Sequence, residues 1–119
     1  MITVDPSAAV SPFEQVRSQI ADSIRSGELG EGARLPSIRQ LAADLQVAAG
    51  TVAKAYSALE VEGLIESSRA RGTRVRAGNA HGERVRAAAQ VFVDAAQGIT
   101  LEEALGAVRA AWMTQASGQ

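Results

Sequence analysis

The chain has 119 residues, 46% of them hydrophobic, a formal net charge of −1 and no cysteine. The missing cysteine excludes disulfides, thiolate catalysis and cysteine metal sites, and it fits the reducing cytoplasm, where we expect the protein to act. No apolar run approaches the roughly 20 residues that span a bilayer, and the N-terminus lacks the features of a secretory signal, so we expect no membrane attachment by the chain itself.

Two helices separated by a loop are predicted in the first part of the chain. Ser11 stands three residues before Glu14, which is the spacing of a capping box at the start of a helix. Ser37 and Gln40 repeat this spacing. Residues 27–36 between the two helices are rich in turn formers and are predicted to be a loop. Apolar residues recur at helical spacing after each cap, at Phe13, Val16, Ile20 and Ile24 and then at Ile38, Leu41, Ala42 and Leu45.

A third helix and a β-hairpin follow. The helix is predicted over about residues 50–62, and Gly63 is suited to end it. A strand begins at residues 64–66, the polar residues 67–72 form a turn, and residues 73–76 alternate as a returning strand. The apolar residues of the third helix share one inward face, formed by Val52, Ala55, Tyr56 and Leu59.

Two further helices are predicted after a polar linker at residues 77–82. Thr100 and Glu103 form a third capping box, and the chain after Met113 is expected to fray. Two short helices bury too little surface to be stable alone, so they need the main domain or a second copy of the chain. We expect dimerisation through the apolar faces of these helices, at Val85, Phe92, Leu101, Leu105, Val108 and Trp112.

Three helices followed by a hairpin is the order of a winged helix-turn-helix. The segment from Gly27 to Val75 resembles the DNA-binding domain of the GntR family of bacterial transcription regulators. The short tail resembles the YtrA-type subfamily, in which two helices replace a large ligand domain. The family's spacing is matched by the Leu35-Pro36-Ser37-Ile38-Arg39 run, the Thr51-Val52 pair, Ala55-Tyr56, Leu59-Glu60 and Glu62-Gly63-Leu64-Ile65.

The resemblance implies a mainly α fold with a small β-hairpin wing. Residues 1–78 would form a winged helix-turn-helix DNA-binding domain, and residues 79–119 a helical dimerisation tail. The third helix would lie in the major groove, and the wing would touch the minor groove or the backbone. The residues expected to contact DNA are Arg34, Ser37, Arg39, Gly50, Thr51, Lys54, Arg69, Arg71 and Thr73.

The chain departs from the family pattern at two places. Ala48-Ala49-Gly50 stands where many members have a Ser or Asn cap and a base-reading side chain. Alanine caps a helix poorly and offers a base edge no hydrogen bond. Ala70 stands where a wing glycine is common. We therefore expect specificity to depend more on Arg39, the wing and DNA shape.

Simpler interpretations of these residues stay open. From charge alone, the acid-free arginine run at residues 69–76 is a solvated loop; only its place on a wing favours a functional role. Arg39 could instead form a surface ion pair with Asp44 or Glu60. Thr51 could simply help to cap its helix. Lys54 would be an ordinary solvent-facing lysine if no DNA groove lay beside it. The lone His81 would be solvated, because a metal site needs further ligands.

No nucleophile motif, Gly-rich phosphate loop or paired His and carboxylate is present, so we expect no enzyme, no cofactor and no metal site. The sequence predicts a sequence-specific regulator that binds a palindromic operator in double-stranded DNA as a homodimer. We favour a repressor, although activation would use the same bound protein. The alternative is a winged-helix protein-interaction module without sequence-specific DNA binding. A small-molecule effector stays open.

Overall fold

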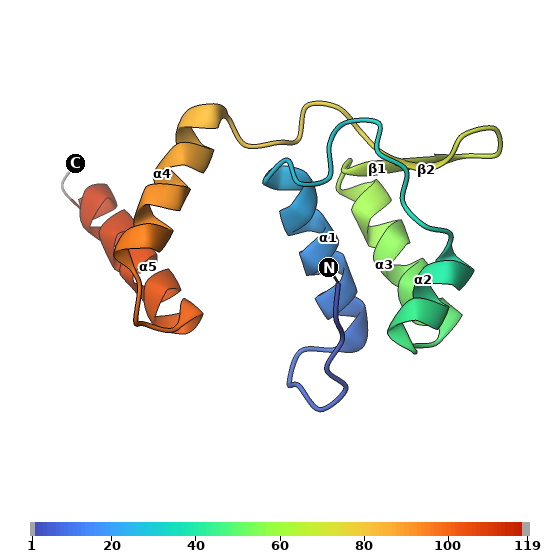
Figure 1. The fold of residues 1–119 in the computed structure, drawn as a ribbon, viewed down its shortest axis with the longest axis horizontal. Helices are drawn as coiled ribbons and strands as arrows, with labels where there is room; N and C mark the ends of the chain where they lie inside the picture. Colours follow the sequence, from blue (N-terminus) through green and yellow to red (C-terminus); the bar gives the residue numbers. More distant parts are fainter. Residues whose placement is uncertain (1, 118–119) are drawn as a thin grey trace. The chain divides into compact units, whose positions relative to one another are not determined.

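Five helices and one antiparallel hairpin make up the secondary structure of residues 2–117, which the computed structural model describes (Figure 1). The chain divides into two units, and the boundary falls between His81 and Gly82. This architecture confirms the predicted mainly α fold with a β-hairpin. The elements are α1 (Pro12–Arg25), α2 (Ile38–Leu45), α3 (Ala49–Val61), β1 (Ile65–Ser68), β2 (Gly72–Val75), α4 (Glu83–Ala95) and α5 (Leu101–Ser117).

Helix α1 begins at its predicted cap, but only half of the capping box forms. The Ser11 hydroxyl accepts a hydrogen bond from the Glu14 N–H at 3.3 Å. The Glu14 carboxylate pairs with Arg17 instead of returning to the cap, and this hydrogen bond lowers the pKa of Glu14. Arg17 also reaches Glu62 at 3.1 Å, just beyond α3. The predicted cap side chain therefore helps to join two helices.

The other two predicted capping boxes differ from each other. The Ser37 hydroxyl accepts from the Gln40 N–H at 3.1 Å, but the Gln40 side chain donates to Asp44 at 2.8 Å, one turn further along α2. At the start of α5 both halves form. The Thr100 hydroxyl accepts from the Glu103 N–H at 3.1 Å, and the Glu103 carboxylate accepts from the Thr100 N–H at 3.0 Å.

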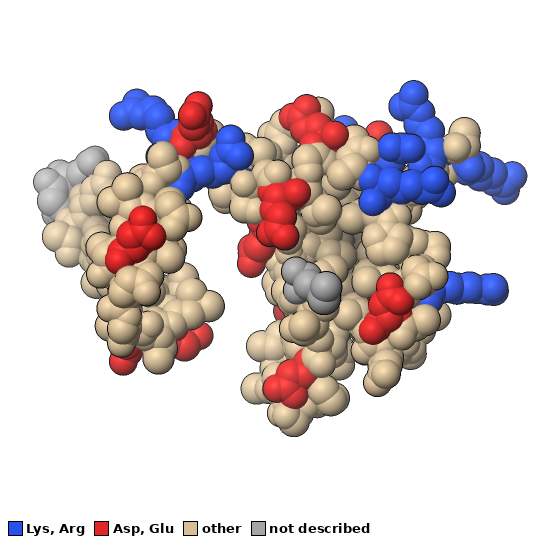
Figure 2. Space-filling model, in the orientation of Figure 1, with Lys and Arg blue, Asp and Glu red and all other residues tan. Residues whose placement is uncertain are grey.

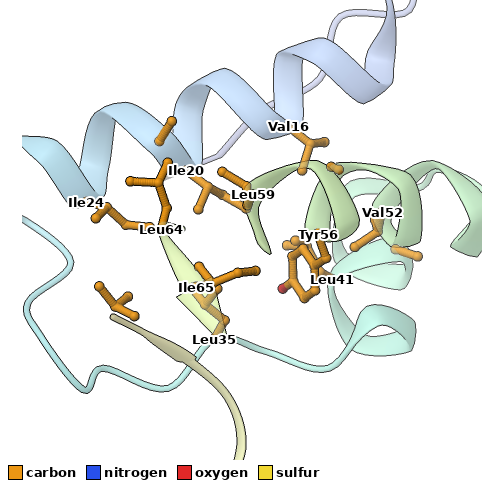
Figure 3. Packing of buried hydrophobic residues seen from close by; sticks show 14 residues of the cluster. Val16, Ile20, Ile24, Leu35, Leu41, Val52, Tyr56, Leu59, Leu64 and Ile65 are labelled. Atoms are coloured by element: carbon orange, nitrogen blue, oxygen red, sulfur yellow. The ribbon is translucent and has the colours of Figure 1, made fainter. Parts of the chain in front are cut away.

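The core of the first unit lies between α1, α2, α3 and the hairpin (Figure 3). Ile20 and Ile24 of α1 pack with Leu59 of α3 and with Leu64, which precedes β1. Shortening a buried side chain of this kind costs about 2–5 kcal/mol. All four residues predicted to face inward from α3 are buried, namely Val52, Ala55, Tyr56 and Leu59.

Part of the predicted loop before α2 pairs with the hairpin. The Leu35 N–H donates to the Thr73 carbonyl at 2.8 Å, and the Val75 N–H donates to the Ala33 carbonyl at 2.9 Å. Residues 33–35 therefore run along β2 on the side opposite β1. Strand β2 is therefore hydrogen-bonded on both edges, to β1 on one side and to residues 33–35 on the other.

The segment before α1 is held by two glutamines. The Gln19 amide group bonds both the N–H and the carbonyl of Thr3, at 3.1 and 2.7 Å. The Gln15 amide group bonds the N–H and the carbonyl of Asp5, at 2.8 and 2.9 Å. These hydrogen bonds hold the N-terminal segment along α1. It adds two partly buried side chains to the core, Ile2 and Val4.

The second unit is a helical hairpin without a core of its own. Over residues 82–116 no residue is buried. Helix α5 continues to Ser117, so the predicted fraying after Met113 is wrong for residues 114–117; residues 118 and 119 lie outside the described part. Two residues of this last turn, Gln115 and Ala116, are good helix formers. Within residues 2–117, none of the helices has the length and apolar character needed to cross a bilayer.

Candidate nucleic-acid interface

Helices α2 and α3 form a helix-turn-helix with a tight connection. Gln46 adopts the left-handed region at φ 57°, and α3 begins three residues later at Ala49, after its N-cap residue Ala48. Ala48 has extended backbone geometry at φ −65° and ψ 144°, yet no side chain caps the helix. The weak cap predicted from the sequence is therefore present. The first N–H groups of a helix lack partners in the preceding turn, and no side chain supplies one at this end of α3.

The exposed residues at the start of α3 have small side chains and almost no polar groups. Ala48, Ala49 and Gly50 are exposed, and the space around Gly50 is open. Thr51 is half-buried, and its hydroxyl makes no hydrogen bond to the residues that the structure describes. This end of α3 can approach another surface closely, but it offers few side-chain donors.

Arg39 lies exposed on α2, the first helix of the pair. Within residues 2–117 it forms neither of the ion pairs considered from the sequence, with Asp44 or Glu60. Asp44 accepts a hydrogen bond from Gln40 instead. The guanidinium group of Arg39 is therefore available to an anionic partner.

Lys54 is not the free surface lysine considered from the sequence. Its ammonium nitrogen lies 4.5 Å from the centre of the Phe13 ring, which places it against α1. A cation–π contact at an exposed site contributes roughly 0.5–1 kcal/mol. Reaching into a groove would require Lys54 to leave this contact. Lys54 thus already has a partner within the chain, unlike Thr51 on the same helix.

The wing consists of β1 and β2, with Ile65 opposite Val75 and Ser68 opposite Gly72. The base of the wing is buried through Ile65 and Val75. Further out, the hydroxyl groups of Ser67 and Thr73 share a hydrogen bond of 3.0 Å. Thr73 thus has one polar contact within the wing and is only half-exposed.

The arginines of the wing fall into two kinds. Arg74 donates from Nε to the Arg71 carbonyl at 3.0 Å and from Nη1 to the Gly32 carbonyl at 2.9 Å. Its guanidinium group therefore holds the wing together. The guanidinium groups of Arg69 and Arg71 contact no partner among the described residues. Figure 2 shows cationic side chains gathered at the free end of the hairpin. The sequence analysis named Arg69 and Arg71, and not Arg74, as DNA contacts, but it did not predict the hydrogen bonds that hold Arg74.

Arg34 lies across the backbone of Gly72. A Cβ atom at Gly72 would stand 3.2 Å from Nε and 3.3 Å from Nη2 of Arg34, and Gly72 has φ +70°. The left-handed backbone favours glycine here, and an added Cβ would also require the Arg34 guanidinium group to shift slightly. The exposed Arg34 is thereby fixed on the same face of the wing as Arg74, its cross-strand neighbour. The glycine in the predicted turn was the available signal for this contact.

Tyr56 fixes the entrance to α2 from within the core. Its hydroxyl donates to the Pro36 carbonyl at 2.8 Å, one residue before the cap Ser37. Burial raises the pKa of Tyr56 to about 12. The hydroxyl is a structural donor, which agrees with the core position predicted for it.

The predicted dimerisation residues lie on the two helices of the second unit. Phe92 is half-buried and lines a cavity of about 220 Å³ at the turn between α4 and α5. The other five are exposed, namely Val85, Leu101, Leu105, Val108 and Trp112. Across the described residues, no three His, Cys, Asp or Glu side chains gather closely enough to hold a metal ion.

Comparison with known proteins identifies similar chains over both units. Residues 12–75 match the family described as "Bacterial regulatory proteins, gntR family". The HTH-type transcriptional regulator Rv1152 of Mycobacterium tuberculosis is 38% identical over 106 residues, which cover 87% of this chain and 88% of Rv1152.

Two solved structures have similar folds. YtrA from Sulfolobus acidocaldarius, a GntR-family transcription factor, is 33% identical with a TM-score of 0.61, over 81% of this chain and 98% of YtrA. The DNA-binding domain of AraR, solved in complex with operator ORX1, is 25% identical with a TM-score of 0.55, over 61% of this chain and 93% of that domain.

Proposed function

This chain belongs to the gntR family of bacterial regulatory proteins, and we propose that it is a homodimeric repressor that binds a palindromic operator. Its relatives are transcription regulators with a DNA-binding domain, and not enzymes. The proposal adds the oligomeric state, the symmetry of the operator and the direction of regulation to that family role.

The observation that carries the proposal is the pair of unpartnered guanidinium groups at the wing tip, Arg69 and Arg71. They belong to the same unit as α2 and α3, and the base of their wing is tied to that unit by residues 33–35. Free cations on a fixed support attract phosphate without losing an internal ion pair. The operator complex of the similar AraR domain supports DNA as the partner of this surface.

The remaining contacts follow from the groups left free around α2 and α3. Arg39 has an unpaired guanidinium group and supplies base or phosphate recognition. The Ser37 hydroxyl accepts from α2 and keeps its own O–H to donate to a phosphate. Gly50 leaves room for the DNA backbone. Thr51, the next residue of α3, supplies a hydroxyl group to the DNA. Arg34, Lys54 and Thr73 also belong to the proposed interface, although each has a contact within the protein.

The proposed dimer places two wings and two copies of α3 on one duplex. A two-fold axis makes the preferred site palindromic, with half-sites about one helical turn, roughly 34 Å, apart. Helices α4 and α5 have exposed apolar faces that a second copy would cover. Repression requires only occupancy of the operator, whereas activation also requires a productive contact with polymerase. Because repression has the simpler requirement, we favour a repressor.

Fluorescence anisotropy with labelled duplexes tests the proposal. The duplex is the region upstream of the chain's own gene, and a shuffled duplex is the control. We expect tighter binding to the native duplex, and affinity for both that falls as salt rises. Arg39→Ala should reduce the preference between the two duplexes. Equal, weak binding that vanishes at physiological salt would instead favour a protein-interaction module, or an operator elsewhere in the genome.

A further inference from the structure

The apolar stripe of α5 is symmetric along the helix. Leu101, Leu105, Val108 and Trp112 are separated by four, three and four residues, which places them on one face. The two outer side chains are 73% and 71% exposed, and the two inner ones are each 44% exposed. In an antiparallel pair of this helix, each outer side chain would therefore lie opposite an outer side chain of the other copy, and each inner side chain opposite an inner one. This is the self-complementarity that a two-fold interface requires.

A cavity lies at one end of this stripe. It has a volume of about 220 Å³ at the turn between α4 and α5, and its apolar lining includes Phe92, Ala96, Ile99, Leu101 and Ala104. Ligand sites usually measure about 300–1,000 Å³, so this cavity is small for an effector. It is better suited to a single large side chain.

Trp112 of the same chain cannot fill this cavity. It lies eleven residues beyond Leu101 on one continuous helix, which separates the two positions by about 16 Å along the axis. In an antiparallel pair centred between Gly106 and Ala107, Trp112 lies opposite Leu101 of the second copy, at the edge of the cavity. Leu105 then lies opposite Val108 of that copy.

The charges beside the stripe favour the same direction. Glu102 and Arg109 are seven residues apart, so they share one flank of the apolar stripe. In an antiparallel pair, like flanks meet, and each Glu102 lies near Arg109 of the other copy. In a parallel pair, this flank meets the opposite one, where the chain has only Ala104 and Ala111. Charges on these flanks set the orientation of paired helices.

We propose that two copies pair through antiparallel α5 helices, with Trp112 of each copy seated in the α4–α5 turn cavity of the other. This inference rests on the proposed homodimer and specifies its interface. It assigns the cavity to a side chain of the second copy rather than to a small molecule.

Trp112 is the only tryptophan, so the fluorescence of the full chain reports its environment directly. We expect the emission to move to shorter wavelength over the concentration range in which sedimentation shows dimer formation. Trp112→Ala should raise the dimer dissociation constant about 100-fold or more, because buried tryptophans are frequent interface hot spots. Met113→Ala is the matched control: Met113 is 61% exposed on the same helix but lies off the apolar stripe and does not line the cavity, and we expect no change.

Sedimentation and tryptophan emission separate the failure of the homodimer from the failure of the Trp112 seating. A monomer at all concentrations overturns the proposed homodimer itself. A dimer whose tryptophan emission stays that of an exposed indole leaves the homodimer intact and overturns the seating of Trp112.

Mixing two charge variants tests the antiparallel direction. Glu102→Arg and Arg109→Glu each place like charges together in their homodimers. A mixed dimer restores both opposite-charge pairs. Native mass spectrometry of a mixture, with one variant extended by a short tag, should show mixed dimers several-fold above the statistical fraction. A statistical distribution would contradict the antiparallel pairing.

Discussion

Two arginines of the same hairpin, Arg71 and Arg74, should respond in opposite ways to truncation. Arg74→Ala removes hydrogen bonds of 3.0 and 2.9 Å to the carbonyls of Arg71 and Gly32. At about 0.5–1.5 kcal/mol for each bond, the loss of folding free energy is about 1–3 kcal/mol. In a unit of this size, 1 kcal/mol shifts Tm by about 4–8 °C. Arg71→Ala removes a side chain without a partner, and its stability should change by less than about 0.5 kcal/mol.

In DNA binding, Arg71→Ala should have the larger effect and Arg74→Ala the smaller one. Arg71→Ala removes a proposed phosphate contact from each protomer, so the slope of log affinity against log salt should decrease by about 2 for a dimer. Arg74→Ala should leave that slope close to the parent value at temperatures where the wing is folded. Thermal unfolding by circular dichroism and anisotropy at several salt concentrations measure the two effects. Equal effects of the two variants on both measurements would refute the division of the wing arginines.

Three further substitutions test other parts of the account. Ala48→Ser should raise the unfolding free energy by about 0.5–1 kcal/mol in a urea titration, because it adds the missing cap of α3. A lower unfolding free energy would contradict this. Ser37→Ala removes an existing cap and should lower the unfolding free energy. The pKa of Tyr56 is about 12 when folded and near 10 when unfolded, so stability should fall between pH 10 and 12, and less so in Tyr56→Phe. Gly72→Ala should lower Tm, because an alanine is strained at φ +70°; an unchanged Tm would contradict this strain.

The helices and the hairpin could be predicted because their signals are local. Ser11, Ser37 and Thr100 each cap the helix that their spacing predicts. The inward face of α3 follows from the 3.6-residue period, and the wing follows from alternation after Gly63. Such signals need only neighbours within a few residues, so they survive whatever the rest of the chain does.

The contacts that tune the candidate site could not be predicted, because they join distant segments. Nothing within a few residues of Leu35 indicates that residues 33–35 pair with β2. Arg74 reaches Gly32, and Lys54 reaches Phe13, only after the fold has brought them together. Similarly, the Glu14 carboxylate pairs with Arg17 instead of accepting a hydrogen bond from the N–H of the cap residue Ser11. A charged side chain has several partners within reach, and the tertiary structure selects among them.

The central claim is that two copies of this chain bind one operator. Sedimentation of a labelled duplex from the upstream region, with increasing protein at physiological salt, measures it most directly. The account predicts two protomers on each native duplex at saturation, and no comparable complex on a shuffled duplex. One protomer on each duplex, or equal complexes on both, would contradict a homodimeric regulator that recognises a palindromic site.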